Sequence, residues 1–403
     1  MAGFKIAPVV SLLEKNKAVE ARLGWIYDFW AALKPYAYVR EEDNVVILPP
    51  NLVYKTNKTG VYLVRHIENG GKFSELPDMT QEKTDQIHDY FMSIRSVYRQ
   101  EPVSLDSVVY DFSFTKLPVL GEIAVTYRCN NACRFCYAGC ADAAQNSCSK
   151  YPELNTQSLK ALIDIFRDKC KIPFFSFTGG EPLLRNDLED LIAYAVSRDL
   201  RVNLISNGTL ATKERAGSLY ASGLRTAQIS LEGTDSATHD YLTAIPGSFK
   251  KTLEGIHALQ EAGIAVQTNT TLNAFNKSNI CAMPQFVSSL GVTRMSMNLY
   301  IPTGTLEFRE SLAVSYSECA GILPLVQKAA KQANMTFYWY SPLPMCIYNP
   351  IANGFGNKNC AACDGLVSVA PDGSLLPCSS YDEPLGNMLD AEFSELWFSG
   401  KAQ

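Results

Sequence analysis

The alternation of short apolar strands with amphipathic helices between residues 123 and 300 is the feature that most restricts the fold of this 403-residue chain. Parallel neighbours in a sheet require helical crossovers, so repeated strand–helix units predict a parallel sheet. Six units are too few for the usual closed eight-stranded barrel, and we expect a partial (β/α)6 barrel of the α/β class. The predicted strands are 123–126, 174–178, 202–206, 226–231, 265–272 and 294–300.

Composition and charge exclude several functional classes. With 47% hydrophobic and 19% charged residues, the chain has an ordinary globular composition. Its net charge of -5 argues against a nucleic-acid partner bound by bulk phosphate neutralisation. Because no apolar run approaches membrane-span length and no signal segment is visible, we expect a cytoplasmic protein with no membrane partner. In that compartment the twelve cysteines are core thiols or metal ligands rather than disulfides.

Three cysteines directly follow the first predicted strand, at Cys129, Cys133 and Cys136. Loops at the carboxyl ends of parallel strands are where such folds place their chemistry. Three thiolates within eight residues can hold an iron–sulfur cubane and leave one iron open to another molecule. A structural zinc knuckle is the alternative, with Cys140 as its fourth ligand.

This C-x-x-x-C-x-x-C pattern, with an aromatic residue before its last cysteine, resembles the radical S-adenosylmethionine (AdoMet) enzymes. The resemblance implies a 4Fe-4S cluster on the three cysteines, with the amino and carboxylate groups of AdoMet on the remaining iron and Phe135 near the adenine. The second strand ends in Gly179-Gly180-Glu181-Pro182, which matches the Gly-Gly-Glu-Pro motif of that family. A backbone edge and a carboxylate there would suit the methionine ammonium group.

Polar residues end the later strands, and by the same resemblance they contact AdoMet. The dipeptide His239-Asp240 and the tripeptide 247–249 also resemble family signals, although His239 fits a simple loop or helix-start histidine better than a proton shuttle. Glu232 stands where many relatives carry aspartate, and Thr243 stands near a position often held by arginine. The candidate AdoMet contacts are Ser206, Asn207, Ser230, Glu232, Thr268, Thr270, Asn273 and Asn298; ordinary polar strand ends would explain the last four equally well.

The resemblance implies an enzyme in which one electron, delivered by a donor such as flavodoxin or ferredoxin, cleaves AdoMet to a 5'-deoxyadenosyl radical. That radical takes a hydrogen from an unactivated carbon, and the protein positions the carbon and excludes water. No general acid or base can be assigned from the sequence.

A second cysteine set lies near the C-terminus, at Cys346, Cys360, Cys363 and Cys378. A strand, an Asp372-Gly373 turn and a returning strand predict a hairpin that brings Cys378 back toward Cys360 and Cys363. The segment resembles the SPASM and twitch extensions of radical AdoMet enzymes, which implies one auxiliary 4Fe-4S cluster; a zinc ribbon is the alternative. Cys140 and Cys148 belong to neither set. They are either loop thiols or contacts for redox chemistry or substrate above the first cluster.

We therefore expect three domains, at 1–105, 106–335 and 336–403. The first resembles peptide-recognition domains related to the chaperone of pyrroloquinoline-quinone synthesis, and a winged-helix cap explains the same pattern. The predicted function is a maturase that cross-links, epimerises or oxidises a peptide or protein, engaged through a leader sequence. An enzyme that decarboxylates a small molecule such as a haem precursor, and a non-catalytic zinc-binding protein, are the alternatives.

Overall fold

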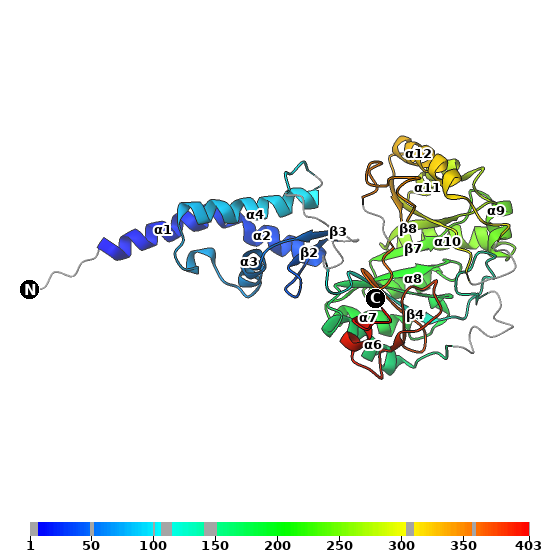
Figure 1. Ribbon diagram of the computed structural model, residues 1–403, viewed down its shortest axis with the longest axis horizontal. Coiled ribbons are helices and arrows are strands. Elements are labelled where there is room, and N and C mark those ends of the chain that lie inside the picture. Colours follow the sequence, from blue (N-terminus) through cyan, green and yellow to red (C-terminus); the bar gives the residue numbers. More distant parts are fainter. Residues whose placement is uncertain are drawn as a thin grey trace, which may run out of the picture. The chain divides into compact units, whose positions relative to one another are not determined.

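A computed structural model describes residues 7–48, 52–99, 101–105, 115–140, 151–303, 310–356 and 360–402. The chain forms two compact units, Met1–Val119 and Leu120–Gln403 (Figure 1). The predicted further division of the second unit at residue 335 stays a prediction. Cys148 lies outside the described residues.

The helices of the structure include no candidate membrane span in the described residues. None of those in the described ranges combines the length and apolar character that crossing a bilayer requires.

The first unit packs helices against a small antiparallel sheet with the order β1-β2-β3. Its middle strand reads Val-Val-Ile-Leu and is buried throughout, while the edge strand β3 is partly exposed. Helices α1 and α4 pack side by side (Figure 1), and Trp30, Phe73 and Phe91 form the centre of the core. The elements are α1 (Ala7–Leu23), α2 (Trp25–Leu33), η1 (Lys34–Tyr36), β1 (Tyr38–Arg40), β2 (Val45–Leu48), β3 (Leu52–Lys55), α3 (Lys58–Glu68), η2 (Phe73–Glu75) and α4 (Gln81–Arg99).

The second unit is built on one sheet with the order β10-β9-β8-β7-β6-β5-β4-β11-β12-β13. All pairs from β10 to β4 are parallel, which confirms the predicted α/β partial barrel. The sequence missed β10, and the ends of the six predicted strands are displaced by three residues at most. The strands are β4 (Leu120–Thr126), β5 (Phe174–Gly179), β6 (Arg201–Ser206), β7 (Thr226–Ser230), β8 (Ala265–Leu272), β9 (Arg294–Leu299), β10 (Thr336–Trp339), β11 (Leu366–Val369), β12 (Ser374–Leu376) and β13 (Gly386–Asn387).

Helices connect these strands and cover the apolar face of the sheet. Phe175 of β5 packs edge-on against Phe166 of α6, and both rings are buried. The N-caps follow ordinary rules: the side chains of Asn155 and Thr212 each accept a backbone N–H of the following turn. The helices are α6 (Thr156–Asp168), η4 (Pro182–Leu184), α7 (Leu188–Ser197), α8 (Lys213–Ala221), α9 (Ser236–Thr243), α10 (Ser248–Glu261), η5 (Ile280–Ala282), α11 (Met283–Ser289), α12 (Tyr316–Gln332) and α13 (Phe393–Trp397).

The C-terminal hairpin is a continuation of the same sheet. Strand β11 pairs in parallel with β4, in a register that sets Ser368 opposite Glu122, and β12 and β13 follow in antiparallel order. Gly373 has φ +89° at the predicted Asp-Gly turn, a conformation that glycine adopts easily. The two cysteine sets therefore grow from neighbouring strands, although more than 200 residues separate them along the chain.

Candidate active site

The cysteine loop begins where β4 ends, and it packs directly on the Gly-Gly-Glu loop of β5. The Gly180 N–H donates to Thr126 O at 2.7 Å, and the Glu181 N–H donates to Arg128 O at 2.9 Å. A Cβ atom on Gly179 would lie 2.1 Å from Thr126 O, and one on Gly180 would lie 2.2 Å from Arg128 O. Glycine is required at both positions because any side chain would separate the two loops.

Helix α9 supports the other side of the cysteine loop. The Ala132 N–H donates to Thr243 O at 3.0 Å, and the Arg134 N–H donates to Leu242 O at 2.9 Å. Phe135, the predicted adenine neighbour, packs against a buried cluster that includes Leu242. These backbone contacts, which carry no sequence signature, hold the loop between two elements.

The structure brings the three predicted cysteines together. Electrostatic interactions join the thiols of Cys129, Cys133 and Cys136 to one another. Burial raises the pKa of Cys129 to about 12 and also raises the pKa of Cys133, whereas a hydrogen bond from Cys140 lowers the pKa of Cys136. Thiols must be deprotonated to bind iron, so loading this site would release protons.

These donors fit a cluster of several irons in their chemistry. A cubane takes one thiolate on each of three irons, whereas a zinc ion needs all its ligands around one point. Within the described ranges, no three cysteine, histidine or acidic side chains are arranged to hold a single metal ion.

Glu181 anchors the Gly-Gly-Glu loop to the end of β6. Its side chain is fully buried, and its two oxygens accept from Ser206 Oγ and from the Asn207 N–H, each at 2.8 Å. Asn207 in turn donates to Asn130 Oδ1 at 2.8 Å, inside the cysteine loop. The predicted polar strand ends of β5 and β6 thus form one network with the loop, and direct contact of Glu181 with the methionine ammonium stays a prediction.

Glu232 and His239 form a second buried polar group, after β7. Burial raises the pKa of Glu232 to about 8, and its carboxylate accepts the Thr271 N–H at 2.9 Å. Burial lowers the pKa of His239 to about 4, and the neutral ring accepts the Glu232 N–H. Asp240 accepts the backbone N–H groups of Gly247 and Phe249. The tripeptide 247–249, which resembles a family signal, is thus the start of α10, held by the Asp240 carboxylate.

Two predicted AdoMet contacts have buried oxygens with no hydrogen-bond partner among the described residues. These are Thr268 Oγ1 on β8 and Asn298 Oδ1 on β9. Asn298 lies on the same face of the sheet as Ser296, opposite the helices, where a partner outside the chain would satisfy it. Thr268 lies between Gln267 and Asn269, which both bond to Ser296, so its own side chain points to the helix-covered face and away from the predicted AdoMet contacts. Ser230 ends β7 half-buried, whereas Thr270 donates to Leu231 O and Asn273 to Thr271 O, which gives these two structural bonds.

The C-terminal cysteines are more exposed. Cys360, Cys363 and Cys378 interact electrostatically, and Cys378 Sγ accepts the Ser380 N–H at 3.4 Å. Burial raises the pKa of Cys363 and Cys378. Cys346 is exposed, and within the described part of the chain it interacts with none of the three. The four-thiolate ligand set therefore stays a prediction, with Cys346 its weakest member.

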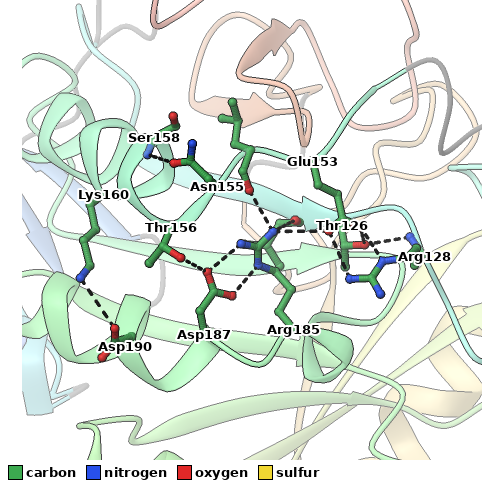
Figure 2. A network of polar contacts seen from close by, with 12 residues as sticks. Thr126, Arg128, Glu153, Asn155, Thr156, Ser158, Lys160, Arg185, Asp187 and Asp190 are labelled. Carbon is green, nitrogen blue, oxygen red and sulfur yellow. Dashed lines mark hydrogen bonds and ion pairs between the residues drawn. The ribbon is translucent and has the colours of Figure 1, made fainter.

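One acidic residue that the sequence did not single out connects the site to α6. Glu153 accepts from Arg128 Nε at 2.7 Å and from the hydroxyl of Thr126, and Arg185 Nη1 lies 3.5 Å from it (Figure 2). Arg185 also forms a two-pronged pair with Asp187, at 2.9 and 2.7 Å. Arg128 and Arg185 are thus engaged by carboxylates, whereas Arg134, inside the cysteine loop, donates to Tyr241 O at 2.9 Å and lies over the Tyr241 ring.

Comparison with known proteins identifies the family. The profile of the Radical SAM superfamily matches residues 123–289, from β4 through α11. An AdoMet-dependent heme synthase of Nitratidesulfovibrio vulgaris is 31% identical over 288 residues, which cover 68% of this chain and 77% of that protein. The chain belongs to the radical SAM superfamily. Its relatives are enzymes, and the predicted enzymatic class is confirmed.

Peptide-modifying proteins also appear among its relatives. A PqqA peptide cyclase of Xanthomonas euvesicatoria is 26% identical over 298 residues, covering 71% of this chain and 75% of that protein. The fold matches Streptococcus suis SuiB bound to its precursor peptide SuiA, with TM-score 0.65 and 14% identity over 89% of this chain and 85% of that one. It also matches anSMEcpe with bound AdoMet and a peptide, with TM-score 0.56 and 16% identity over 71% and 81%. The SuiB match is too extensive to lie within the second unit alone.

Proposed function

We propose that this enzyme binds a 4Fe-4S cluster on Cys129, Cys133 and Cys136, binds AdoMet on the strand ends of β5 to β9, and modifies a peptide or protein. When bound, these groups supply a 5'-deoxyadenosyl radical. The protein holds the cysteine loop against Gly179 and Gly180, and Asn298 offers a buried oxygen to the cosubstrate.

The observation that favours a peptide is the row of amide and hydroxyl side chains that bond to one another across the inner face of the sheet. Opposite the helix-covered face, side chains from neighbouring strands bond to one another: Asn203 to Ser176, and Gln267 to Gln228 and Ser296. Such amides and hydroxyls match the donors and acceptors of a peptide backbone. Along this face of β4 to β9, the arginines are Arg201 and Arg294, each at the first residue of its strand, opposite the cysteine end.

A tetrapyrrole with several carboxylates would need cations near the cysteine end. Arg128 and Arg185 are engaged by Glu153 and Asp187, and Arg134 donates to Tyr241 O and lies over its ring. The carboxyl group of Glu122 lies on the inner face, hydrogen-bonded to Ser368 at 2.6 Å. Burial raises the pKa of Glu122, and in either protonation state this group supplies no positive charge to a propionate, whereas it can hydrogen-bond an amide.

The first unit offers a place to hold a leader sequence. Strand β3 is an edge of the small sheet, and Leu52 on it is 43% exposed. An extended peptide can add to such an edge through main-chain hydrogen bonds. We propose this edge as the leader site, and we propose one auxiliary 4Fe-4S cluster on the C-terminal cysteines.

The test uses the anaerobically reconstituted protein, AdoMet, a reductant and a short peptide encoded beside the gene. We expect 5'-deoxyadenosine and a peptide that has lost two hydrogen atoms or, for an epimer, gained deuterium from D2O. Formation of 5'-deoxyadenosine with no change in any such peptide, together with decarboxylation of an iron coproporphyrin, would reverse the assignment.

That tetrapyrrole reaction is the second candidate, because the heme synthase relative is more similar in sequence than the peptide cyclase. The two matches cover similar shares of the chain, 68% and 71%, so the choice between the two reactions depends on the residues of the inner face.

A further inference from the structure

Residues 151–155, which we call the strap, touch both cysteine regions. The strap leads into α6, where Asn155 caps the helix by accepting the Ser158 N–H at 2.9 Å. It therefore starts from a rigid element and crosses the junction between the cysteine loop and the C-terminal hairpin. Figure 2 shows the contacts of Glu153 and Asn155.

On one side the strap holds the start of the cysteine loop. Glu153 binds the side chains of Thr126 and Arg128, and the Arg128 carbonyl accepts the Glu181 N–H at 2.9 Å. Although burial opposes it, the hydrogen bonds from Arg128 and Thr126 lower the pKa of Glu153. The ring of Tyr151 packs edge-on against Tyr127, with centroids 5.7 Å apart.

On the other side the strap holds the C-terminal segment. The Leu154 N–H donates to Pro371 O at 2.9 Å, at the turn of the hairpin. The hydroxyl of Tyr151 donates to Asp382, four residues beyond Cys378. Tyr151 also shares a buried cluster with Tyr127, Ala370 and Leu376, against which Cys129 and Cys136 pack.

We propose that the strap couples the C-terminal cysteine segment to the AdoMet site, with Tyr151 and Asp382 as positioning residues. The contacts form a continuous path from Asp382 through Tyr151 to Tyr127 and the cysteine loop. Loss of the contact between Asp382 and Tyr151 lets the cysteine loop shift relative to Gly180, and this shift weakens AdoMet binding. This inference rests on the proposed binding of AdoMet at the cysteine loop. Coupling between sites is reciprocal, so AdoMet also orders the C-terminal segment.

The test compares Tyr151→Phe and Asp382→Asn with a matched control, Glu392→Gln. Glu392 also ties the C-terminal segment to the barrel, through Lys169 at 3.1 Å, but this pair is exposed and lies at the far end of α6. All three changes keep the side-chain shape: Y151F removes the donor hydroxyl, whereas D382N and E392Q replace a charged acceptor by a neutral and weaker one. The readouts are substrate-free 5'-deoxyadenosine formation against AdoMet concentration, the EPR spectrum of the reduced protein with and without AdoMet, and amide hydrogen exchange.

We expect Y151F and D382N to raise the KM for AdoMet about three- to tenfold, with kcat changed less than about twofold. The AdoMet-dependent EPR change should need correspondingly more AdoMet. Exchange should quicken at residues 123–136, and AdoMet should protect residues 374–388 in the wild type more than in Y151F. E392Q should behave as wild type.

If the KM for AdoMet and the hydrogen exchange of residues 123–136 are the same in all three variants, the proposed coupling through the strap is wrong. If Y151F does not fold, D382N carries the same test, since it leaves the aromatic cluster intact. A wild-type protein that binds no AdoMet contradicts the proposed function instead, and the exchange of residues 123–136 in the variants still tests the strap.

Discussion

The two cysteine sets grow from adjacent strands, β4 and the β11–β12 hairpin, but their surroundings differ. The first is clamped by backbone hydrogen bonds from the Gly-Gly-Glu loop and from α9, and Cys129 and Cys136 pack against a buried apolar and aromatic cluster. In the second, Cys346 and Cys360 are exposed, and Cys378 follows a short strand. The first set is therefore held in place by the protein before any cofactor binds, which suits chemistry that needs exact placement. The arrangement of the second set depends more on the metal that it binds.

Replacing the cysteines of either set should produce the largest difference between the two regions. Alanine at Cys129, Cys133 or Cys136 removes a ligand of the open cluster, and we expect AdoMet cleavage to fall to background. Alanine at Cys360, Cys363 or Cys378 should lower the iron content by about half and leave substrate-free cleavage within a few-fold. Iron analysis and 5'-deoxyadenosine assays measure both.

Cys281→Ala is the matched control, because this thiol is exposed and belongs to neither set. Loss of AdoMet cleavage in the C-terminal variants but not in C133A would contradict the division of roles.

A methyl group at Gly180 tests the clamp on the first set. The added Cβ would lie 2.2 Å from Arg128 O, which is backbone and cannot turn away. We expect Gly180→Ala to lower the free energy of unfolding by about 3 kcal/mol and to abolish AdoMet binding. Denaturant unfolding and binding titrations check this.

Gly217→Ala is its control, since nothing lies within 4 Å of a Cβ there, in the middle of α8. That change should stabilise the protein by about 0.5–1 kcal/mol. A G180A protein as stable and active as G217A would show that the loops are not clamped.

The pH dependence of stability sharpens the comparison, because Glu232 interacts electrostatically with the first set. Its pKa is raised from 4.5 to about 8 in the folded protein, so between these values the folded state holds a proton that the unfolded state has lost. This stabilisation is complete below pH 4.5 and disappears as the pH rises through 8.

In Glu232→Gln the contribution is absent. Relative to this variant, the metal-free wild type should lose up to about 1.4 kcal/mol per pH unit over that window. Chemical unfolding at a series of pH values measures it. Parallel pH curves for the two proteins would mean that Glu232 titrates normally.

The smallest effect is expected at the second set. Gly373→Ala in the hairpin turn would place a side chain on a residue with φ +89°, 3.0 Å from Asn387 Oδ1, and the Asn387 amide is held by hydrogen bonds to Asp372 O and from the Leu389 N–H. We expect a loss of about 1–2 kcal/mol and no change in AdoMet binding. If G373A loses as much stability as G180A, the protein holds the two cysteine sets equally rigidly, and the comparison fails.

Much of the barrel could be predicted from sequence, because apolar runs and helical spacing mark β4 to β9 directly. β10 was missed because its four residues, Thr336–Trp339, follow a long helix that itself contains Pro324. The cysteine loop and the Gly-Gly-Glu motif were visible as short contiguous patterns. Glu153 and the carbonyls of Leu242 and Thr243 were not, because tertiary contacts alone bring them to the loop.

The most direct test of the account is EPR spectroscopy of the anaerobically reconstituted, dithionite-reduced protein, with and without AdoMet, combined with assay of 5'-deoxyadenosine. We predict a signal of a reduced 4Fe-4S cluster that changes when AdoMet is added and is absent in C133A, together with AdoMet cleavage. A colourless protein that holds zinc, shows no such signal and leaves AdoMet intact would contradict it.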